Sequence, residues 1–391
     1  MRQKQNWFFL ASYILITSIA FTATYAAGYF TRATIERNGV AGNAQYPLLS
    51  EVRGIIDISF LGEMPSDTQL EYGMIRGLLT AVGDRYTIFL EPPAQELETQ
   101  SLQGEFGGIG VSLRRDEAGL IVLSPFPEAP AAIAGIEEGD VLVAVDGKPI
   151  TPETTLDEIS ALVRGPVDTT VIVTIQQGSE APRDYTLTRQ VFEIPSVTGR
   201  ALEQDPTIGL VAVSRFSEKT PIEIQRVIDE LQAKGVSRVV LDLRGNGGGL
   251  LDSAVDTASV FLDGGVVMYE TRGGEGEKTY DAPGTGAEAE LPLVMIVNGG
   301  TASAAEILAG ALRDRGRGPL IGQTTYGKGS VQLIFTLSDG SSIHVTNARW
   351  HTPNHTGIDG IGLKPDIEIQ PGTDGSDPEL DRAIEYLQSL P

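Results

Sequence analysis

Two side chains in the carboxyl-terminal half could form a nucleophile and its base. Ser303 follows the turn Asn298-Gly-Gly-Thr-Ala302, and Lys328 lies twenty-five residues further on, within Gly327-Lys-Gly-Ser-Val-Gln332. A serine hydroxyl is a weak nucleophile until a base removes its proton, and a lysine amine does this only where burial lowers its pKa. We interpret Ser303 as the nucleophile and Lys328, among small and apolar neighbours, as its general base. Gln332 is expected to hold the lysine amine by a side-chain hydrogen bond.

The segments on either side of Ser303 suit that chemistry. The apolar run Leu293–Val297 predicts a buried strand, and the run from Ala304 to Arg313 predicts a helix with Ser303 at its head. Two glycines between them let the backbone reverse sharply and expose the first helical side chain. Because N–H groups at a helix amino end favour developing negative charge, the Ala304 N–H is expected to be an oxyanion donor.

Other interpretations of these residues stay open. A serine after a Gly-Gly turn is commonly a plain helix cap, and a lysine between glycines is commonly a solvated loop charge. The run 322–329 is close to a phosphate-binding loop, but Gly329 stands where the magnesium-binding hydroxyl belongs. The run 331–337 that follows is rich in strand formers, where such a loop requires a helix. A Ser–His pair is the last alternative, using one of the three histidines, which are His344, His351 and His355.

Composition limits the function classes. A chain of 391 residues predicts two or three domains with a sizeable core. Its 52 acidic and 29 basic residues give a formal charge of −23, which opposes binding to nucleic acid or to an anionic membrane surface. The absence of cysteine excludes disulfides and thiolate chemistry, and three histidines leave little for a histidine-rich metal site.

The amino terminus predicts a membrane segment. Arg2 and Lys4 precede the uncharged stretch from Trp7 to Phe30, which as a helix of about 1.5 Å per residue would span a bilayer core of about 30 Å. This favours a transmembrane anchor within residues 1–31, a cytoplasmic amino terminus and export of the rest to a cell-envelope or periplasm-like space. A signal peptide cleaved near Ala26 is the alternative. A polar linker, 32–46, follows.

The next two regions differ in character. Residues 47–103 carry two helical patterns, ending in Val82-Gly-Asp-Arg-Tyr86, and we interpret them as a small packing subdomain. Residues 104–190 are short strand-like runs between Gly and Pro turns, with one helix expected at 155–163. They resemble a PDZ domain, in which a Gly-rich loop and a sheet edge bind a peptide's carboxyl terminus. Here that loop is Gly108-Ile109-Gly110-Val111.

From about residue 195 strands and helices alternate, which predicts an α/β layered core. The turn Arg244-Gly-Asn-Gly-Gly-Gly249 directly follows an apolar strand, so its bare backbone is expected close to a bound substrate carbonyl, unless it is only a helix-entry loop. The Gly- and Glu-rich run 271–290 is interpreted as a surface excursion. The last helix, 378–390, is expected to be a packing or oligomer contact, and a homo-oligomer is left open.

Four motifs in order resemble the carboxyl-terminal processing peptidases, also called tail-specific proteases. They are Asp242-Leu-Arg-Gly-Asn-Gly-Gly-Gly249, Asn298-Gly-Gly-Thr-Ala-Ser-Ala-Ala-Glu-Ile307, Gly327-Lys-Gly-Ser-Val-Gln332 and Gly362-Leu-Lys-Pro-Asp366. The resemblance covers roughly residues 47–370. It implies an α/β protease core of the ClpP/crotonase-like kind over 191–371, with an inserted PDZ domain, a small N-terminal helical region, an N-terminal anchor and a C-terminal helix over 372–391.

The resemblance also implies roles for particular residues. Ser303 matches the family nucleophile, Lys328 its general base and Gln332 the residue that orients the lysine. Ala304 and Gly249 match the backbone oxyanion donors, with the adjacent Gly248 as an alternative to Gly249. The PDZ domain of this family recognises carboxyl tails of substrates and regulates some members. Arg164 matches a position at its hinge side, which makes a regulatory role our hypothesis.

Two departures from the family pattern lie away from the four motifs. Val82-Gly-Asp-Arg-Tyr-Thr-Ile88 replaces the usual Leu-Asp-Pro-x-Ser, and Asp168-Thr169 replaces a Gly-Thr pair.

The function expected from the motifs and the resemblance is that of a serine endopeptidase that uses neither metal nor nucleotide and cleaves proteins recognised by their carboxyl termini. The alternative from another class is a catalytically silent PDZ scaffold or peptide-binding protein.

Overall fold

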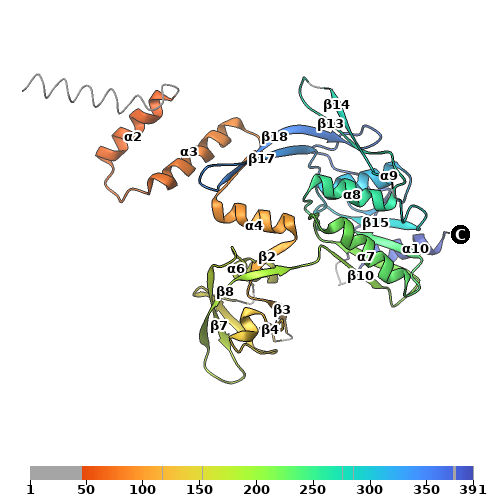
Figure 1. Cartoon of the computed structure of the whole chain (residues 1–391), viewed down its shortest axis with the longest axis horizontal. Helices are drawn as coiled ribbons and strands as arrows, with labels where there is room; N and C mark the ends of the chain where they lie inside the picture. The colour runs from red at the N-terminus through yellow and green to blue at the C-terminus, as the bar shows by residue number, and fades with distance from the viewer. Residues whose placement is uncertain are drawn as a thin grey trace, which may run out of the picture. The chain divides into compact units, whose positions relative to one another are not determined.

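The computed structural model describes residues 46–390, except 117, 152, 275, 285 and 373–375. The chain divides into two compact units, Met1–Met74 and Ile75–Pro391. In the first unit lies α2 (Pro47–Ser59), and α3 (Asp67–Val82) runs across the division (Figure 1). A proline at the start of α2 fits the first turn of a helix, because a backbone N–H at that position would have no hydrogen-bond acceptor within the helix. Neither helix buries a side chain.

The membrane segment predicted from Trp7 to Phe30 lies outside the described residues. Within the part of the chain that the structure describes, no helix combines the length and the apolar character needed to cross a bilayer.

The predicted PDZ region is a compact β-rich domain. Its strands and helices are β2 (Glu105–Gly108), β3 (Val111–Arg115), β4 (Ile121–Pro125), α5 (Pro130–Ile133), β5 (Val141–Val145), β6 (Lys148–Pro149), α6 (Leu156–Val163), β7 (Thr170–Gln176), β8 (Arg183–Thr188) and β9 (Gln190–Glu193). One sheet has the order β3-β4-β5-β7-β8 with β6 beside β5, and β2 pairs with β9 as a separate ribbon. Thr155 caps α6, as the predicted start of that helix requires.

The protease-like region contains the alternating strands and helices expected from the sequence, together with several short strands that the sequence analysis did not predict. They are β10 (Val197–Ala201), β11 (Ile208–Val213), α7 (Thr220–Gln232), β12 (Arg238–Asp242), α8 (Leu251–Phe261), β13 (Val266–Thr271), β14 (Glu277–Asp281), β15 (Leu293–Val297), α9 (Ala304–Asp314), β16 (Leu320–Gly322), β17 (Ser330–Thr336), β18 (Ser342–His351), β19 (Ile367–Glu368) and α10 (Pro378–Gln388). The main sheet has the order β10-β11-β12-β15-β16-β19 and is parallel from β11 to β19. A second, five-stranded sheet contains β13, β14, β17 and β18 and the short strand β1 (Ile88–Leu90).

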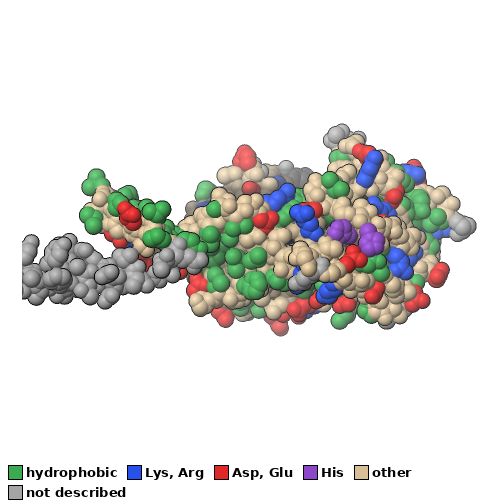
Figure 2. Space-filling view, turned by 90° about the horizontal axis from the view of Figure 1, so that it is seen from above, with side chains coloured by type: hydrophobic (Ala, Val, Ile, Leu, Met, Phe, Trp, Pro, Cys, Tyr) green, Lys and Arg blue, Asp and Glu red, His purple; other side chains and the backbone are tan. Residues whose placement is uncertain are grey.

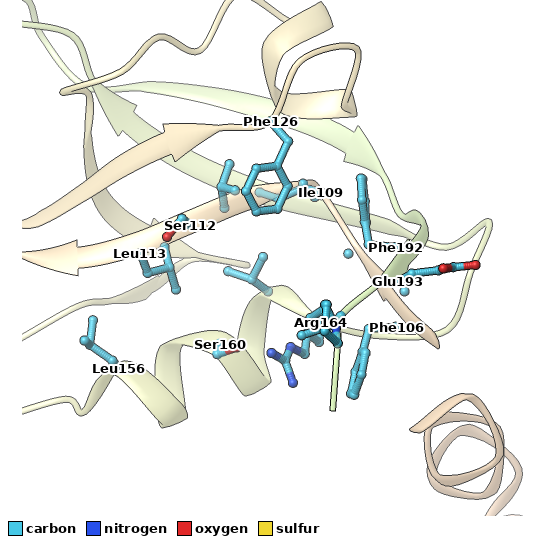
Figure 3. Close-up of a pocket in the computed structure, with 17 residues that line it drawn as sticks. Phe106, Ile109, Ser112, Leu113, Phe126, Leu156, Ser160, Arg164, Phe192 and Glu193 are labelled. Carbon is cyan, nitrogen blue, oxygen red and sulfur yellow. The ribbon is translucent and has the colours of Figure 1, made fainter. Parts of the chain in front are cut away.

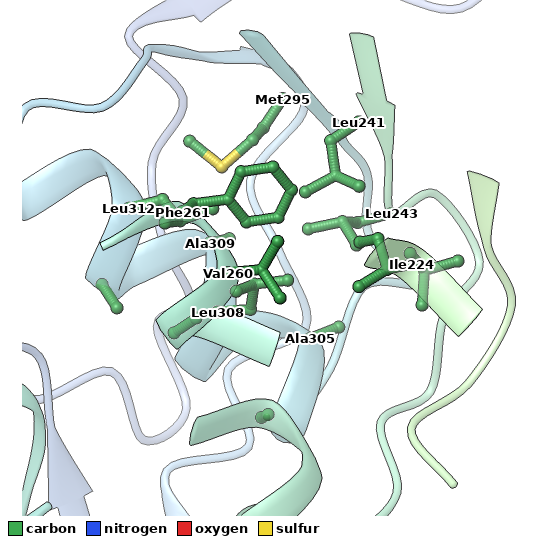
Figure 4. Close-up of a cluster of buried hydrophobic side chains, with 14 of the residues drawn as sticks. Ile224, Leu241, Leu243, Val260, Phe261, Met295, Ala305, Leu308, Ala309 and Leu312 are labelled. Carbon is green, nitrogen blue, oxygen red and sulfur yellow. The ribbon is translucent and has the colours of Figure 1, made fainter. Parts of the chain in front are cut away.

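Helices cover both faces of the main sheet, so its central strands alternate between two cores. Leu241, Leu243 and Met295 pack against α7, α8 and α9 in the larger cluster (Figure 4). On the other face Val240 joins residues of α10 such as Leu387 in a second cluster. A strand buried on both faces reads as a continuous apolar run, which is the pattern of Leu293–Val297. The PDZ domain has a third, separate core.

Two segments have contacts that the sequence interpretation did not specify. In the last part of the region 47–103, which we interpreted as a small packing subdomain, β1 (Ile88–Leu90) pairs with β18 and α4 (Pro92–Gln103) contacts the protease core. The surface excursion interpreted over 271–290 contains β14, which pairs with β13. Both pairings depend on strands that are remote in sequence or short, and local patterns carry little signal for such contacts.

On the face that Figure 2 shows, acidic and basic side chains are interspersed.

Candidate active site

Three loops that follow neighbouring parallel strands form the candidate site. The glycine turn ending at Gly249 follows β12, the turn before Ser303 follows β15, and the loop holding Lys328 follows β16. The carboxyl ends of parallel strands meet at one edge of a sheet, where α/β proteins commonly bind ligands. Topology therefore brings together three motifs that the sequence separates by tens of residues.

Hydrogen bonds join the first two loops closely. Asn298 Oδ1 accepts the N–H groups of Gly245 at 3.0 Å and Gly300 at 2.9 Å. The Thr301 hydroxyl donates to the Leu243 carbonyl at 2.8 Å, and the Ala302 N–H donates to the Asn246 carbonyl at 2.9 Å. These hydrogen bonds, of which the Thr301 and Ala302 contacts are buried, fix one loop against the other, so the backbone before Ser303 is held in place.

Ser303 has a backbone conformation that a plain helix cap does not need. Its φ is 54° and its ψ is −118°, whereas a helix cap ordinarily has an extended conformation with negative φ. Holding a non-glycine residue in such a sparsely populated region costs about 1–3 kcal/mol. The sequence predicted the sharp turn, and the structure adds that the serine itself carries the strain, as in the nucleophile elbows of hydrolases.

The glycine loop approaches Ser303 closely. A side-chain carbon on Gly248 would lie 2.8 Å from the Ser303 Cβ and 3.1 Å from the Ala304 nitrogen, so only glycine fits there. The Gly248 N–H is already used, because it donates to Asn246 Oδ1 at 2.9 Å. Within the described part of the chain, the N–H groups of Gly249 and Ala304 have no such acceptor. This geometry favours Gly249 over Gly248 as a partner of Ala304 in binding an oxyanion.

Lys328 shares one cavity with Ser303. The cavity has a volume of about 310 Å³, and both side chains line it together with Gly249 and Gln332. The Lys328 amine donates to Gln332 Oε1 at 2.9 Å, which is the contact that the spacing predicted. Burial lowers the pKa of Lys328, and the nearby Glu98 carboxylate offsets only part of that shift.

Glu306 joins the loop that holds Ser303 to the loop that holds Lys328, contacts that the sequence analysis did not predict. This carboxylate is fully buried. It accepts the Ser303 N–H at 2.9 Å, the Lys328 N–H at 2.9 Å and the Gly327 N–H at 2.8 Å, and it also accepts the Thr325 hydroxyl. Glu at the third position of a helix is an ordinary capping residue. The sequence pattern is fully explained by capping, so it gave no sign of the other hydrogen-bond donors, which lie in the loop after β16.

Residues from the amino-terminal side also reach the cavity. Glu98 and Leu102 of α4 line it, and the Tyr86 carbonyl accepts a hydrogen bond from the Gln332 amide. Sequence reasoning missed all three residues, because no local pattern linked residues 84–103 to a loop more than two hundred residues away.

The structure bears on the two alternatives to a Ser–Lys pair, which are a phosphate-binding loop at 322–329 and a Ser–His pair. The loop at Lys328 runs into β17, a strand, so the helix that a phosphate-binding loop requires is not there. Of the three histidines only His344 lines the cavity, and its Nε2 lies 3.0 Å from Glu98 Oε2. His355 stacks on Tyr269, with ring centroids 4.1 Å apart. The geometry therefore favours Lys328 as the partner of Ser303.

The predicted peptide-binding loop borders a groove in the PDZ domain (Figure 3). Gly108, Ile109, Gly110 and Val111 all line this cavity of about 410 Å³. Gly110 has a φ of 72°, and a side-chain carbon there would collide with Ala129. The other lining residues include the apolar side chains Leu113, Phe126, Leu156, Val163 and Phe192, besides Arg164.

The fold and the site define a peptidase with an α/β catalytic core and a PDZ domain. The sequence pattern of peptidase family S41 matches residues 207–369, and that of the PDZ domain matches residues 121–177. A carboxy-terminal-processing protease of Bartonella bacilliformis is 36% identical over 314 residues, covering 78% of this chain and 71% of that protein. The corresponding protease of Synechocystis is 35% identical and covers 76% and 71%.

A solved structure agrees with these relatives. The photosystem II D1 C-terminal processing protease is 32% identical, with a TM-score of 0.50, and the match covers 91% of this chain and 95% of that one. This chain belongs to the carboxyl-terminal processing peptidases of family S41. It is accordingly a serine-type peptidase that acts on proteins.

Proposed function

We propose that this protein is an endopeptidase that cleaves polypeptides through a Ser303/Lys328 dyad and an acyl-enzyme. The neutral Lys328 amine takes the Ser303 proton as Oγ attacks the scissile carbonyl carbon, and the N–H groups of Gly249 and Ala304 bind the oxyanion. The protonated amine then gives its proton to the leaving amine. Water, activated by Lys328, releases the acyl group and regenerates Ser303.

One observation carries this proposal: a strained serine at the start of α9 lines the same cavity as a lysine whose pKa burial lowers. Gln332 supports the lysine by accepting from its amine, which orients the nitrogen lone pair away from that bond. A protonated lysine could not act as a base, so the low pKa is what the reaction requires at neutral pH.

A cleavage assay with EDTA separates this function from its alternatives. The test uses residues 40–391 and a poorly folded substrate with an apolar carboxyl tail. Cleavage that persists in EDTA and disappears in Ser303→Ala supports the serine peptidase, since a nucleotide-dependent machine needs Mg²⁺. Tail binding without any cleavage by the native protein would instead indicate a silent PDZ scaffold.

The substrate's carboxyl tail is proposed to bind the PDZ groove before cleavage. Pairing of the tail with the edge of β3 would add a strand to the sheet, while the apolar groove takes the last side chains. Substrates would be exported or membrane-associated proteins, because we propose that Trp7–Phe30 anchors the chain with residues after 31 outside the cytoplasm.

Contacts at the end of α6, where Arg164 follows the last helical residue, support the regulatory role that we propose for Arg164. Its guanidinium carbon lies 4.6 Å from the centroid of the Phe106 ring, which lines the groove, and that of Arg215 lies 4.5 Å from the same ring. The residue after Arg215 is Phe216, whose N–H donates to the Gly248 carbonyl at 2.9 Å. The PDZ groove and the glycine loop that ends at Gly249 are thus connected through Phe106, Arg215 and Phe216. Arg164→Ala with unchanged basal rate and unchanged dependence on the tail would refute the role.

A further inference from the structure

A short turn before β1 is fixed to the strand that faces Gln332. Asp84 Oδ2 accepts the hydroxyls of Thr87 and Thr346, and the Thr346 N–H donates to Thr87 Oγ1 at 3.2 Å. Thr346 of β18 is the residue paired with Gln332 of β17, next to an irregularity in their register. The turn 84–87 therefore lies at the point from which Gln332 projects toward the lysine.

Tyr86 in this turn makes two contacts to the base side of the site. Its carbonyl accepts from the Gln332 Nε2 amide group, so the other end of that amide, Oε1, faces the Lys328 amine. Its ring centroid lies 5.3 Å from the same amine. One residue thus selects which end of Gln332 meets the lysine and places a flat apolar surface beside the nitrogen.

Arg85 also contacts the Tyr86 ring. The Arg85 guanidinium carbon lies 4.5 Å from the Tyr86 centroid, and Arg85 donates to the Tyr326 hydroxyl. The Tyr326 N–H donates to the Thr301 carbonyl, in the turn before Ser303, at 2.9 Å. Burial raises the pKa of the Tyr86 phenol, so its hydroxyl stays neutral at neutral pH. Tyr86 is therefore part of a cluster that runs from the base to the nucleophile turn.

We propose that Tyr86 is a positioning residue for Lys328, whose ring keeps water from the amine while its carbonyl fixes the orientation of Gln332. This rests on the proposed Ser303/Lys328 dyad. A lysine that water can reach is protonated at neutral pH and cannot accept the serine proton, so the shielding belongs to the mechanism.

The charged groups around the amine set the sign of the expected effect. Glu98 of α4 opposes the low pKa of Lys328, and His344 of β18 lies beside Glu98. Asp359 and Arg85 act on the Tyr86 side. An aromatic face stabilises a cation by about 0.5–1 kcal/mol at partly exposed sites, whereas burial shifts a lysine pKa by up to about 3–5 units. Removing the ring should therefore raise the pKa of Lys328.

The test measures kcat/KM against pH for the native protein, Tyr86→Phe and Tyr86→Ala, with Tyr280→Ala as the loss of an aromatic ring elsewhere in the protein, on β14. We expect Tyr86→Phe and Tyr280→Ala to keep the acidic limb where it is. Tyr86→Ala should move that limb to higher pH by about one unit and lower kcat at pH 7 about tenfold, with little change in KM. An unchanged limb, or a shift to lower pH, would overturn the proposal.

Two further variants keep the result decisive. Tyr86→Leu retains apolar bulk, so it should shift the limb in the same direction, by less, even where the alanine variant does not fold. Lys328→Ala separates the two proposals. Full activity in Lys328→Ala would remove the dyad and this inference together, whereas an inactive Lys328→Ala beside an unchanged Tyr86→Ala profile would remove the role of Tyr86 alone.

Discussion

The side chains proposed to carry the chemistry were predictable where type and spacing coincide. Ser303, Lys328 and Gln332 stand in short motifs with glycine turns, and the structure brings all three to one cavity. Glu306, Tyr86 and Glu98 were not found, because each has an ordinary local explanation as a capping residue, a helix stop or a solvated charge. Their importance comes from partners on other loops, which spacing alone does not reveal.

Glu306 gives a test of how tightly the loops that hold Ser303 and Lys328 depend on each other. Both carboxylate oxygens of Glu306 accept hydrogen bonds from backbone N–H groups. Glu306→Gln replaces one of these oxygens by an amide NH2 group, which cannot accept, so at least one buried N–H loses its partner. Each such donor costs about 1–3 kcal/mol. We expect a lower free energy of unfolding in urea and a lower kcat.

Glu230→Gln is the matched control for that variant, because Glu230 forms an exposed pair with Arg226. Its effect on stability should stay within about 0.5 kcal/mol. Equal effects of the two substitutions would show that Glu306 does not hold the loops together.

Lys328 gives a prediction about stability and pH. Its folded-state pKa lies below the ordinary 10.5, so between those two values the unfolded chain binds more protons and stability rises with pH. The cost of burying the protonated amine is fully present below the folded-state pKa and disappears above about 10.5. Lys328→Met should therefore be inactive but more stable than the native protein at pH 7.

The exposed Lys234→Met serves as the control for unfolding measurements on that variant. We expect it to leave both stability and activity nearly unchanged. A Lys328→Met protein that is less stable than the native one at pH 7 would contradict the assignment of a neutral, desolvated amine.

At the scale of elements, the sequence predicted the layers of the core but not all of their contacts. Apolar runs marked β12 and β15, and helical patterns marked α7, α8 and α10, because each buries a continuous apolar face. The pairing of β1 with β18 joins residues more than two hundred and fifty positions apart and involves a strand of three residues. No periodicity can be recognised in so short a strand.

The start of α10 is linked by Arg244 to the glycine loop that ends at Gly249. Arg244 binds Asp242 and, through two bonds of 2.7 and 2.9 Å, Asp377 just before α10. Burial alone would lower the pKa of Arg244, but these carboxylates outweigh it and raise the pKa above its ordinary value. The helix therefore contributes a packing face and a charged contact to the loop that ends at Gly249.

Leu387→Ala tests that support. Leu387 is fully buried against the main sheet, so its truncation should cost about 2–5 kcal/mol in the unfolding of the protease core. Glu385→Ala, on the exposed side of the same helix, is the control. Thermal inactivation at lower temperature for Leu387→Ala, with tail binding by the PDZ domain retained, is the expected result, and equal behaviour of the two variants would contradict it.

At the scale of the whole molecule, the PDZ domain and the protease core have separate hydrophobic clusters. Ile175→Ala removes a buried side chain from the PDZ cluster and should cost that domain about 2–5 kcal/mol, so tail binding is lost at a lower temperature than core unfolding. Ile172→Ala, on the exposed face of the same strand, should have little effect. A single transition shifted for both domains would show that they unfold as one.

The measurement that tests the central claim most directly is intact-mass analysis of a substrate with an apolar carboxyl tail, incubated with residues 40–391. It compares the native protein with Ser303→Ala and Lys328→Ala. The account predicts cleavage by the native protein and none by either variant. Cleavage by Lys328→Ala would contradict the dyad and make His344, the histidine in the cavity, the candidate base.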